Sequence, residues 1–271
     1  SAGLPINPDG RGLVQYHRTL QLLDASDTEA FNVVFLGPTG AGKSTLINLL
    51  FNQRVAETSD EADSDVLSCT RNMQFYSGQG DCWAGSGVAG RCTRRHRKIN
   101  IIDTIGFCDS EMSSDEVYRL TKEQIEGNCM RVHRVVICTS GRIEHHHADA
   151  IKQFLKWLKY KPALGIGEHS DPVVFVYTKS DANPSDSPER RRRNIVRMAD
   201  RLGAAVSQLM LPANSDPNPS PVDKYFELNL AVGFPPGSDF LSSDDYRKLG
   251  DILFNTPMKH FNLDRSWCSI L

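Results

Sequence analysis

The chain has 271 residues, of which 39% are hydrophobic and 24% are charged, as expected for a globular protein with a sizeable core. A formal net charge of -2 excludes a global field that would attract nucleic acid, and no apolar run approaches the roughly 20 residues of a membrane span. The seven cysteines are scattered and form no C-x-x-C pair, which favours reduced thiols in a cytoplasmic protein over disulfides or a zinc site.

Residues 1–30 precede the first strong motif and are expected to form an N-terminal arm and a short helix. The arm, residues 1–12, is rich in Pro and Gly. An amphipathic helix ending near Asp24 is predicted from apolar residues at helical spacing: Leu13, Val14, Tyr16, Leu20, Leu22 and Leu23. The N-terminus lacks the layout of a secretory signal. Because the chain starts at Ser1 without Met, we expect the native start to lie upstream.

An octapeptide at positions 37–44, G-P-T-G-A-G-K-S, fits the G-x-x-x-x-G-K-[ST] pattern of a phosphate-binding loop. Apolar residues at 31–36 predict a buried strand before it, and those within 44–51 predict a helix after it. Because backbone amides can surround a polyphosphate only where side chains leave room, we assign nucleotide binding to Gly40, Ala41, Gly42, Lys43, Ser44 and Thr45. Lys43 can reach the terminal phosphates, and the Ser44 hydroxyl can ligate Mg²⁺. The alternative is a Gly-rich turn that merely precedes a helix.

A second motif, D-T-I-G at positions 103–106, follows a strand predicted over 98–102. It fits the D-x-x-G that accompanies a phosphate-binding loop in GTP-binding proteins. Asp103 at the strand end can hold Mg²⁺ through water, and the Gly106 amide can donate to the γ-phosphate.

A third motif, T-K-S-D, begins at Thr178, directly after an apolar strand predicted over 173–177. The Asp181 carboxylate can accept from the N–H and NH₂ groups of a guanine edge, whereas adenine would leave it unpaired at a cost of several kcal/mol. The stem of Lys179 can pack on the base. The alternative is that T-K-S-D is an ordinary exposed segment with no role in binding.

The remaining segments are predicted from periodicity and turn residues. They are an exposed loop over 57–65, a strand over 72–76, a long mobile turn over 77–90, a helix from Ser113 or Ser114 to about 126, a strand over 132–139, helices over 149–160 and 188–209, a loop over 211–221, a strand over 225–232 and a helix from Ser242 or Ser243 to about 254. The basic residues over 91–98 favour a solvated rim, with a binding patch as the alternative.

Strands that alternate with helices indicate the α/β class, here a P-loop NTPase fold with a mostly parallel sheet and helices on both faces. All three motifs follow strand ends, so we expect them to meet at one edge of that sheet. The predicted G domain covers residues 31–257, and residues 258–271 are predicted to form a C-terminal tail.

In this order the three motifs resemble those of the septin-like branch of P-loop GTPases. The similarity is greatest to the immunity-associated GTPases (GIMAP) and their plant AIG-type relatives, and next to the chloroplast Toc receptors. Residues 68–71, S-C-T-R, resemble the first-switch S-x-T-[KR] of this group. Residues 135–143, which end in S-G-R-I, resemble its apolar strand followed by G-R-[FY]. Ile105 stands where the group has proline.

The resemblance implies a G domain that binds GTP or GDP with Mg²⁺, and it adds site residues. Thr70 would be a second hydroxyl ligand of Mg²⁺ with a catalytic role. Arg142 would approach the phosphates of a second copy across a G-domain homodimer, with an ordinary polar residue at a strand end as the alternative. Asn229 would touch the base, because E-L-N at 227–229 is similar to the F-N-N that this group carries after its last strand.

Phe107 occupies the place after D-x-x-G where Ras-like enzymes carry a water-positioning Gln, so slow intrinsic hydrolysis is expected. One hypothesis is a GTPase switch that turns over GTP after dimerising. The alternative is a nucleotide-loaded, septin-like scaffold with negligible turnover. A P-loop kinase acting on a small molecule is disfavoured by the T-K-S-D box, and no hypothesis involves nucleic acid.

The last four residues, C-S-I-L, fit C-a-a-X with a terminal Leu, which is typical of geranylgeranylation, here at Cys268. If Leu271 is the native end, the protein would be membrane-associated on the cytosolic face; otherwise the match has no meaning. The consecutive residues His145, His146 and His147 cannot all face one ion, so a surface or dimer-rim position is favoured over metal or proton chemistry.

Overall fold

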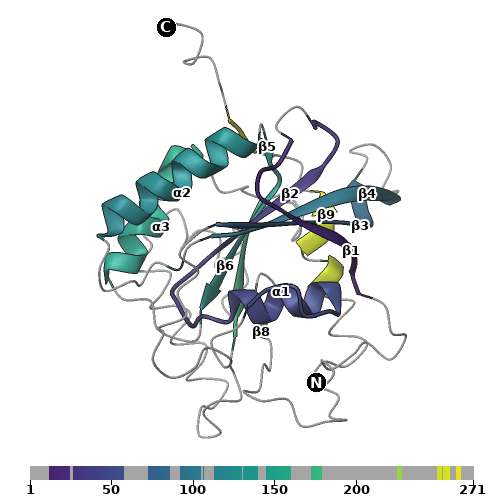
Figure 1. Cartoon of the computed structure of the whole chain (residues 1–271), viewed down its shortest axis with the longest axis horizontal. Coiled ribbons are helices and arrows are strands. Elements are labelled where there is room, and N and C mark those ends of the chain that lie inside the picture. The colour runs from purple at the N-terminus through teal and green to yellow at the C-terminus, as the bar shows by residue number, and fades with distance from the viewer. Residues whose placement is uncertain are drawn as a thin grey trace, which may run out of the picture.

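A central sheet of eight strands, with helices on both faces, organises the computed structural model (Figure 1). Its strands are β1 (Val14–Leu20), β2 (Phe31–Leu36), β3 (Gln74–Gly85), β4 (Cys92–Asp103), β6 (Arg134–Thr139), β7 (Val173–Tyr177), β8 (Tyr225–Glu227) and β9 (Asn255–Thr256). They follow the order β1-β3-β4-β2-β6-β7-β8, and β9 pairs with β3. The structure describes residues 12–24, 27–57, 73–85, 92–104, 106, 113–129, 131–139, 145–159, 172–178, 225–227, 249–251, 253–256 and 261–263.

The middle of the sheet is parallel. β2 pairs in parallel with both β4 and β6, and β7 pairs in parallel with β6 and β8. All six residues of β2 and all six of β6 are buried, as expected for parallel strands covered on both faces. The predicted fold class is confirmed, and these strands end at one edge of the sheet.

Helices α2 (Ser114–Asn128) and α3 (His145–Trp157) lie together on one face of the sheet (Figure 1). Val117 of α2 and Phe154 of α3 pack with Val34 of β2 in one buried cluster. This cluster joins both helices to the middle of the sheet, because β2 lies between β4 and β6.

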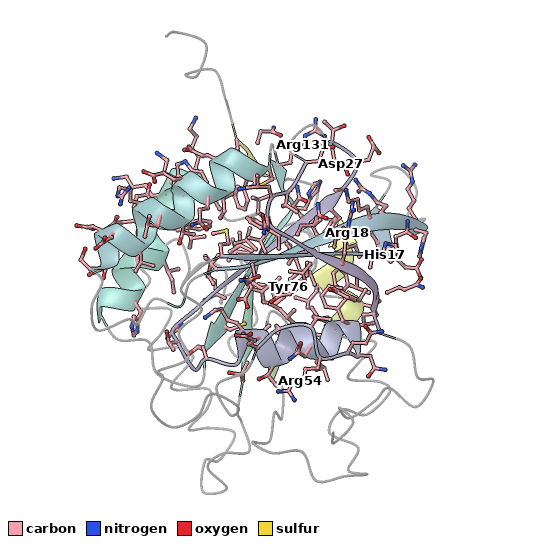
Figure 2. The ribbon with its side chains drawn as sticks, viewed as in Figure 1. His17, Arg18, Asp27, Arg54, Tyr76 and Arg131 are labelled. Atoms are coloured by element: carbon pink, nitrogen blue, oxygen red, sulfur yellow. The ribbon has the colours of Figure 1, made fainter. Side chains whose placement is uncertain are left out.

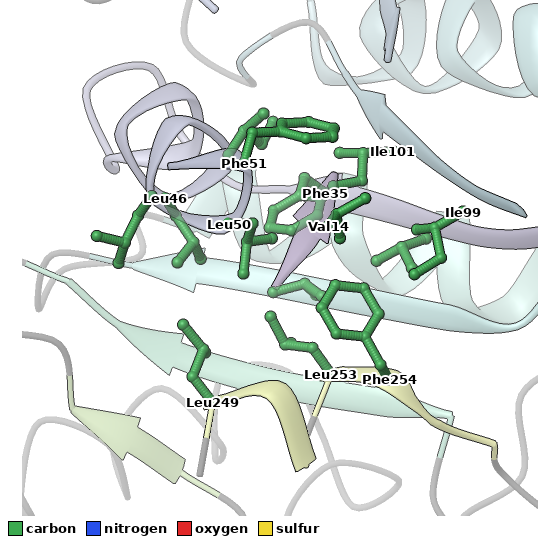
Figure 3. Close-up of a cluster of buried hydrophobic side chains, with 14 of the residues drawn as sticks. Val14, Phe35, Leu46, Leu50, Phe51, Ile99, Ile101, Leu249, Leu253 and Phe254 are labelled. Atoms are coloured by element: carbon green, nitrogen blue, oxygen red, sulfur yellow. The ribbon is translucent and has the colours of Figure 1, made fainter. Parts of the chain in front are cut away.

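Helix α1 (Lys43–Phe51) lies on the opposite face. Its residues Leu46 and Leu50 belong to a second buried cluster, which also holds Phe35 of β2 and Leu253 from a C-terminal helical segment (Figure 3). Neighbouring residues of β2 point to opposite faces of the sheet, so this strand packs against both clusters.

The start of α2 agrees with its sequence signal. The Ser113 hydroxyl accepts a hydrogen bond of 3.2 Å from the Glu116 amide and so caps the helix. Helix α3 begins at His145, ahead of the predicted start at 149. Among the described helices, none combines the length and the apolar composition that crossing a membrane would need.

The segment predicted as an N-terminal helix is instead strand β1, at the edge of the sheet. It runs antiparallel to β3, with Val14 opposite Gly80, and its register shifts between Tyr16 and Arg18. His17 and Arg18 of this strand are labelled in Figure 2. The shift reverses the face of the residues after it, so that Val14 and Tyr16 pack on the α1 side while Leu20 packs on the α2 side. This change of face broke the two-residue alternation of a strand and imitated helical spacing.

The long turn predicted over 77–90 is wrong where the structure describes it, because β3 continues to Gly85 and β4 begins at Cys92. The glycines that suggested a turn have a packing role in β3. A Cβ added to Gly80 would lie 2.7 Å from Ile99 Cδ1 and 2.8 Å from the Leu13 carbonyl oxygen. Glycine at this position of β3 therefore leaves room for the Ile99 side chain of β4 and for the Leu13 backbone just before β1.

The basic residues of β4 divide between solvent and internal contacts. Arg95 is exposed, as in the predicted solvated rim. Arg97, however, donates two hydrogen bonds to the Glu29 carbonyl oxygen, and the Lys98 ammonium lies 2.7 Å from the Asp27 carboxylate. These contacts hold the segment between β1 and β2 against β4.

The strand predicted over 132–139 is interrupted at His133. Before it, β5 (Arg131–Val132) pairs with β10 (Phe261–Asn262) in a separate two-stranded sheet. Part of the predicted C-terminal tail is thus paired with the rest of the fold, next to the amino-terminal end of β6.

The C-terminal half is described only in part. β8 confirms the beginning of the strand predicted over 225–232, and residues 249–251 and 253–254 are helical, within the helix predicted up to 254. The helix predicted over 188–209 and the loop predicted over 211–221 lie outside the described residues.

Candidate functional site

Three loops meet at the edge where the parallel strands end. The loop 37–42 follows β2, Gly106 follows the end of β4, and Thr178 follows β7. The Thr178 hydroxyl donates a hydrogen bond of 2.6 Å to the Ala41 carbonyl. A Cβ added to Gly106 would lie only 2.9 Å from backbone atoms of Thr39. The loop 37–42 is therefore in contact with the segments after both β4 and β7.

Two glycines in the left-handed region shape this loop. Gly40 has φ 73° and Gly42 has φ 79°, values that residues with side chains rarely adopt. Between them, the Ala41 amide donates a hydrogen bond of 3.1 Å to the Pro38 carbonyl and closes the turn. Gly42 caps α1 without a side-chain hydrogen bond, so the first amides of α1 can donate to an anion at the positive end of the helix.

The Lys43 side chain folds back along the loop. Its ammonium donates hydrogen bonds to the Gly37 and Pro38 carbonyl oxygens at 3.0 and 3.1 Å, and the residue is only 7% exposed. A buried ammonium at this end of the loop attracts phosphate oxygens strongly, because little water screens its charge. This geometry fits the phosphate-binding role predicted for Lys43.

Ser44 and Asp103 lie together beneath the loop. The Ser44 hydroxyl donates a hydrogen bond of 3.2 Å to Asp103 Oδ2. Asp103 is 1% exposed, and its Oδ1 is buried without a hydrogen-bond partner among the described residues. A hydroxyl and a carboxylate are the oxygen donors that Mg²⁺ prefers, and the unpartnered Oδ1 can accept from water bound to such a cation. The donor set therefore fits the predicted Mg²⁺ site.

Burial also changes the acidity of this site. It raises the pKa of Asp103 from its ordinary 3.8 to about 6, although the Lys43 charge and the Ser44 hydrogen bond act in the opposite direction. At neutral pH the carboxylate is therefore ionised at an energetic cost. A bound cation would offset this cost, because it favours the charged form.

Thr178 connects the third loop to the rest of the site. Its amide donates a hydrogen bond of 2.7 Å to the Thr139 carbonyl, while its hydroxyl reaches Ala41. The end of β7 is thus fixed both to β6 and to the loop after β2. Lys179 and Asp181 follow this fixed point in the sequence.

The structure brings together the predicted site residues of the three loops: Gly40, Ala41, Gly42, Lys43, Ser44, Thr45, Asp103, Gly106 and Thr178. The remaining predicted site residues lie outside the described part of the chain: Thr70, Arg142, Lys179, Asp181 and Asn229. Their roles stay predictions.

Two threonines of the site were missed by reasoning from the sequence. The Thr104 hydroxyl donates a hydrogen bond of 2.7 Å to the Phe35 carbonyl and so ties the segment after Asp103 to the end of β2. Thr39 Oγ1 is buried beside Gly106 without a hydrogen-bond partner among the described residues. Both occupy variable positions of their motifs, where the sequence pattern carries no signal.

The triple histidine is only partly described. His147 is 3% exposed, so the predicted surface or dimer-rim position is wrong for this residue. Because α3 begins at His145, His147 lies one and two turns ahead of Ile151 and Phe154 on the buried face of the helix. The described residues contain no cluster of three or more side chains able to hold a metal ion.

The described cysteines agree with the prediction of reduced thiols. Cys82, Cys129 and Cys138 are buried and carry thiol groups. Burial raises the pKa of both Cys82 and Cys138 to about 12, so these thiols stay protonated and unreactive at neutral pH.

A family model described as 50S ribosome-binding GTPase matches residues 32–179, which is more than half of the chain. Septin-8-A of Xenopus laevis is 32% identical over 108 residues, which cover 39% of this chain and 22% of that protein. The probable GTP-binding protein EngB of Wolbachia sp. subsp. Brugia malayi is 28% identical over 130 residues, covering 47% of this chain and 55% of EngB. The chain thus spans about a fifth of the septin's length.

Among solved structures, Toc33 of Arabidopsis thaliana in complex with GDP and Mg²⁺ has a TM-score of 0.48 and 16% sequence identity to this chain. That comparison covers 88% of this chain and 89% of Toc33.

The raised pKa of Asp103 predicts how the ligand-free protein responds to Asp103→Asn. The folded pKa of about 6 lies above the ordinary 3.8, so the penalty for ionisation grows between these pH values and is complete above pH 6. Removing the ionisable group should raise the free energy of unfolding by about 1 to 3 kcal/mol at pH 7.5 and by much less at pH 4.5. Urea unfolding in the presence of a chelator measures both values.

The exposed Asp149 on α3 offers a matched control, and Asp149→Asn should change stability by less than about 0.5 kcal/mol at either pH. An Asp103→Asn variant that is less stable than the unmodified protein at pH 7.5 would contradict the prediction.

Proposed function

The chain belongs to the 50S ribosome-binding GTPase family of P-loop GTPases, and we propose that it binds GTP or GDP with Mg²⁺ and hydrolyses GTP slowly. The observation that carries this proposal is the contact of the loop 37–42 with both Gly106 and Thr178. Those contacts support the proposal because they bring the loop 37–42, Gly106 and Thr178, the first residue of the proposed base-recognition box, to one edge of the sheet.

Each described loop supplies one part of the proposed nucleotide site. The amides of residues 40–43 and the Lys43 ammonium bind phosphate oxygens. Ser44 and Asp103 hold the cation, with Thr70 as the further hydroxyl ligand in the proposal. Bound Mg²⁺ would neutralise charge on the β- and γ-phosphates. The Gly106 amide donates to the γ-phosphate.

Recognition of guanine is assigned to the box that starts at Thr178. Hydrogen bonds to Thr139 of β6 and to Ala41 hold Thr178 in place. The box 178–181 therefore begins beside the phosphate loop. Asp181 accepts the two guanine donors, Lys179 packs on the base, and Asn229 completes the contact. Adenine has no matching donor pair and would leave the Asp181 carboxylate unpaired.

The hydrolytic part of the proposal is a switch accelerated by pairing of two G domains. Phe107 has no group that can orient water, so an isolated copy is expected to turn over slowly. Arg142 of one copy would stabilise negative charge on the phosphates of the other. This assignment rests on the resemblance of residues 140–143 to the G-R box of the GIMAP and AIG-type proteins.

Membrane association is proposed through a geranylgeranyl group on Cys268, with the protein otherwise cytoplasmic. A single lipid gives only reversible binding, which suits a switch better than a permanent anchor. The intact mass of the protein isolated from its native cells tests this, since an unmodified Cys268 at a native C-terminus would contradict it.

The second candidate function is a nucleotide-loaded scaffold with negligible turnover. It is favoured by the matches to septins, which cover 39% of the chain, and by the absence of a water-positioning Gln at position 107. The two candidates differ in the rate per protomer: the switch becomes faster as the protein concentration rises, whereas the scaffold stays near zero at every concentration.

Asp181→Ala tests the base contact. Displacement of a fluorescent GDP analogue from the unmodified chain should require GTP or GDP with Mg²⁺, and ATP should fail. In the variant the Kd for GDP should rise by about 100-fold, because both bonds to the guanine edge are lost. Asp149→Ala, a change of the same kind at an exposed site on α3, should leave the Kd unchanged. Equal displacement by ATP and GTP from the unmodified protein would refute the proposed specificity.

Arg142→Ala tests pairing. GTP turnover per protomer is measured while the protein concentration is raised, and the unmodified chain should speed up. The variant should lose at least about tenfold at the highest concentration, because an arginine supplied in trans stabilises the transition state. The control is Arg119→Ala, since Arg119 pairs with Glu123 at 2.9 Å on the exposed side of α2. If both variants behave like the unmodified chain, Arg142 has no such role.

A further inference from the structure

Four buried side-chain atoms have no hydrogen-bond partner among the described residues, and two of them lie at the proposed nucleotide site. They are Thr39 Oγ1 and Asp103 Oδ1. Leaving a buried hydroxyl unpaired costs about 1 to 3 kcal/mol, so such an atom at a binding site indicates a ligand that pairs with it. The metal site accounts for Asp103, whereas Thr39 has no role in the site described so far.

The position of Thr39 indicates which ligand group that is. Thr39 lies between Pro38, whose carbonyl accepts from both Ala41 and Lys43, and Gly40, which is exposed. Its backbone and its hydroxyl are the nearest atoms to a Cβ built on Gly106. A group in contact with Gly106 lies beside whatever the Gly106 amide binds.

We propose that the Thr39 hydroxyl donates a hydrogen bond to the terminal phosphate of a bound nucleoside triphosphate, and so makes the site favour triphosphate over diphosphate. This inference rests on the proposed nucleotide binding and assigns a specificity role to one more residue. A diphosphate lacks the group that Thr39 would contact, so the hydroxyl stays unpaired in that complex. The difference between the two complexes therefore appears as a ratio of affinities.

The competing explanation is that Thr39 only shapes the loop through its bulk. Thr39→Val keeps the branched shape and removes the hydroxyl, while Thr39→Ser keeps the hydroxyl and removes a methyl group. A role in shape predicts that Val is tolerated and Ser is not. A role in hydrogen bonding predicts the reverse.

The test uses the full chain stripped of nucleotide, in Mg²⁺, with a fluorescent GDP analogue displaced by GDP or by a non-hydrolysable GTP analogue. For Thr39→Val we expect the Kd of the GTP analogue to rise by about tenfold, with the Kd of GDP within about twofold of the unmodified value. Thr39→Ser should keep both values within about twofold. If the Val variant does not fold, Thr39→Ala carries the same expectation.

Thr121→Val is the matched control. Thr121 on α2 also has a buried hydroxyl without a partner among the described residues, but it lies in the helix layer away from the phosphate loop. Its replacement should leave both Kd values unchanged. Thermal unfolding of all variants without nucleotide shows whether a change in affinity merely follows a loss of stability.

The outcomes separate the inference from the proposed function. Equal weakening of both nucleotides by Thr39→Val, or no change in either, would overturn the role of Thr39 while nucleotide binding stands. If the unmodified chain binds neither nucleotide, the proposed function itself fails, and the inference fails with it. A selective loss for the triphosphate that Thr39→Ser does not reproduce supports the inference.

Discussion

Parallel pairing of β4, β2, β6 and β7 is the constraint on which the rest of the structure depends. It directs the carboxyl ends of these strands to one edge, so segments far apart in the sequence become neighbours. The 2.6 Å hydrogen bond from Thr178 to Ala41 and the close approach of Gly106 to Thr39 are local consequences of that pairing.

The resulting arrangement favours a bound ligand and lowers the stability of the protein without one. Asp103 is ionised in a buried position, and one of its oxygens has no partner among the described residues. Lys43 is buried nearby with carbonyl oxygens as partners. A bound cation would pair with the Asp103 carboxylate, and a bound anion would pair with the Lys43 ammonium. Ligand binding is therefore expected to raise the free energy of unfolding.

The parts of the fold that could be predicted are those with short-range signals. β7 is a continuous apolar run and β2 is apolar except for Asn32, α2 begins with a serine cap, and the three motifs carry fixed residues at fixed spacing. The site residues within these motifs were predictable for the same reason. The parallel sheet alone predicts that the three motifs lie at one edge, whereas the individual contacts between them do not follow from the sequence.

The parts that could not be predicted depend on tertiary packing. Strand β1 carries a shift in register at Tyr16, which moves Leu20 to the opposite face from Val14. The glycines of β3 suggest a turn in the sequence, because the close packing of Val14, Gln15 and Ile99 against them is visible only in the fold. His147 gave no sign of burial, because the start of α3 decides its face. Thr39 stands at a variable position of its motif.

Hydrogen–deuterium exchange of the ligand-free chain, with and without GDP and Mg²⁺, tests the account most directly. The three loops should respond together: amides of residues 37–45, 103–106 and 178–181 should exchange more slowly with nucleotide, while those of β1 should not change. Protection confined to one of these segments, or no protection at saturating GDP, would contradict the convergence of three loops on one guanine nucleotide.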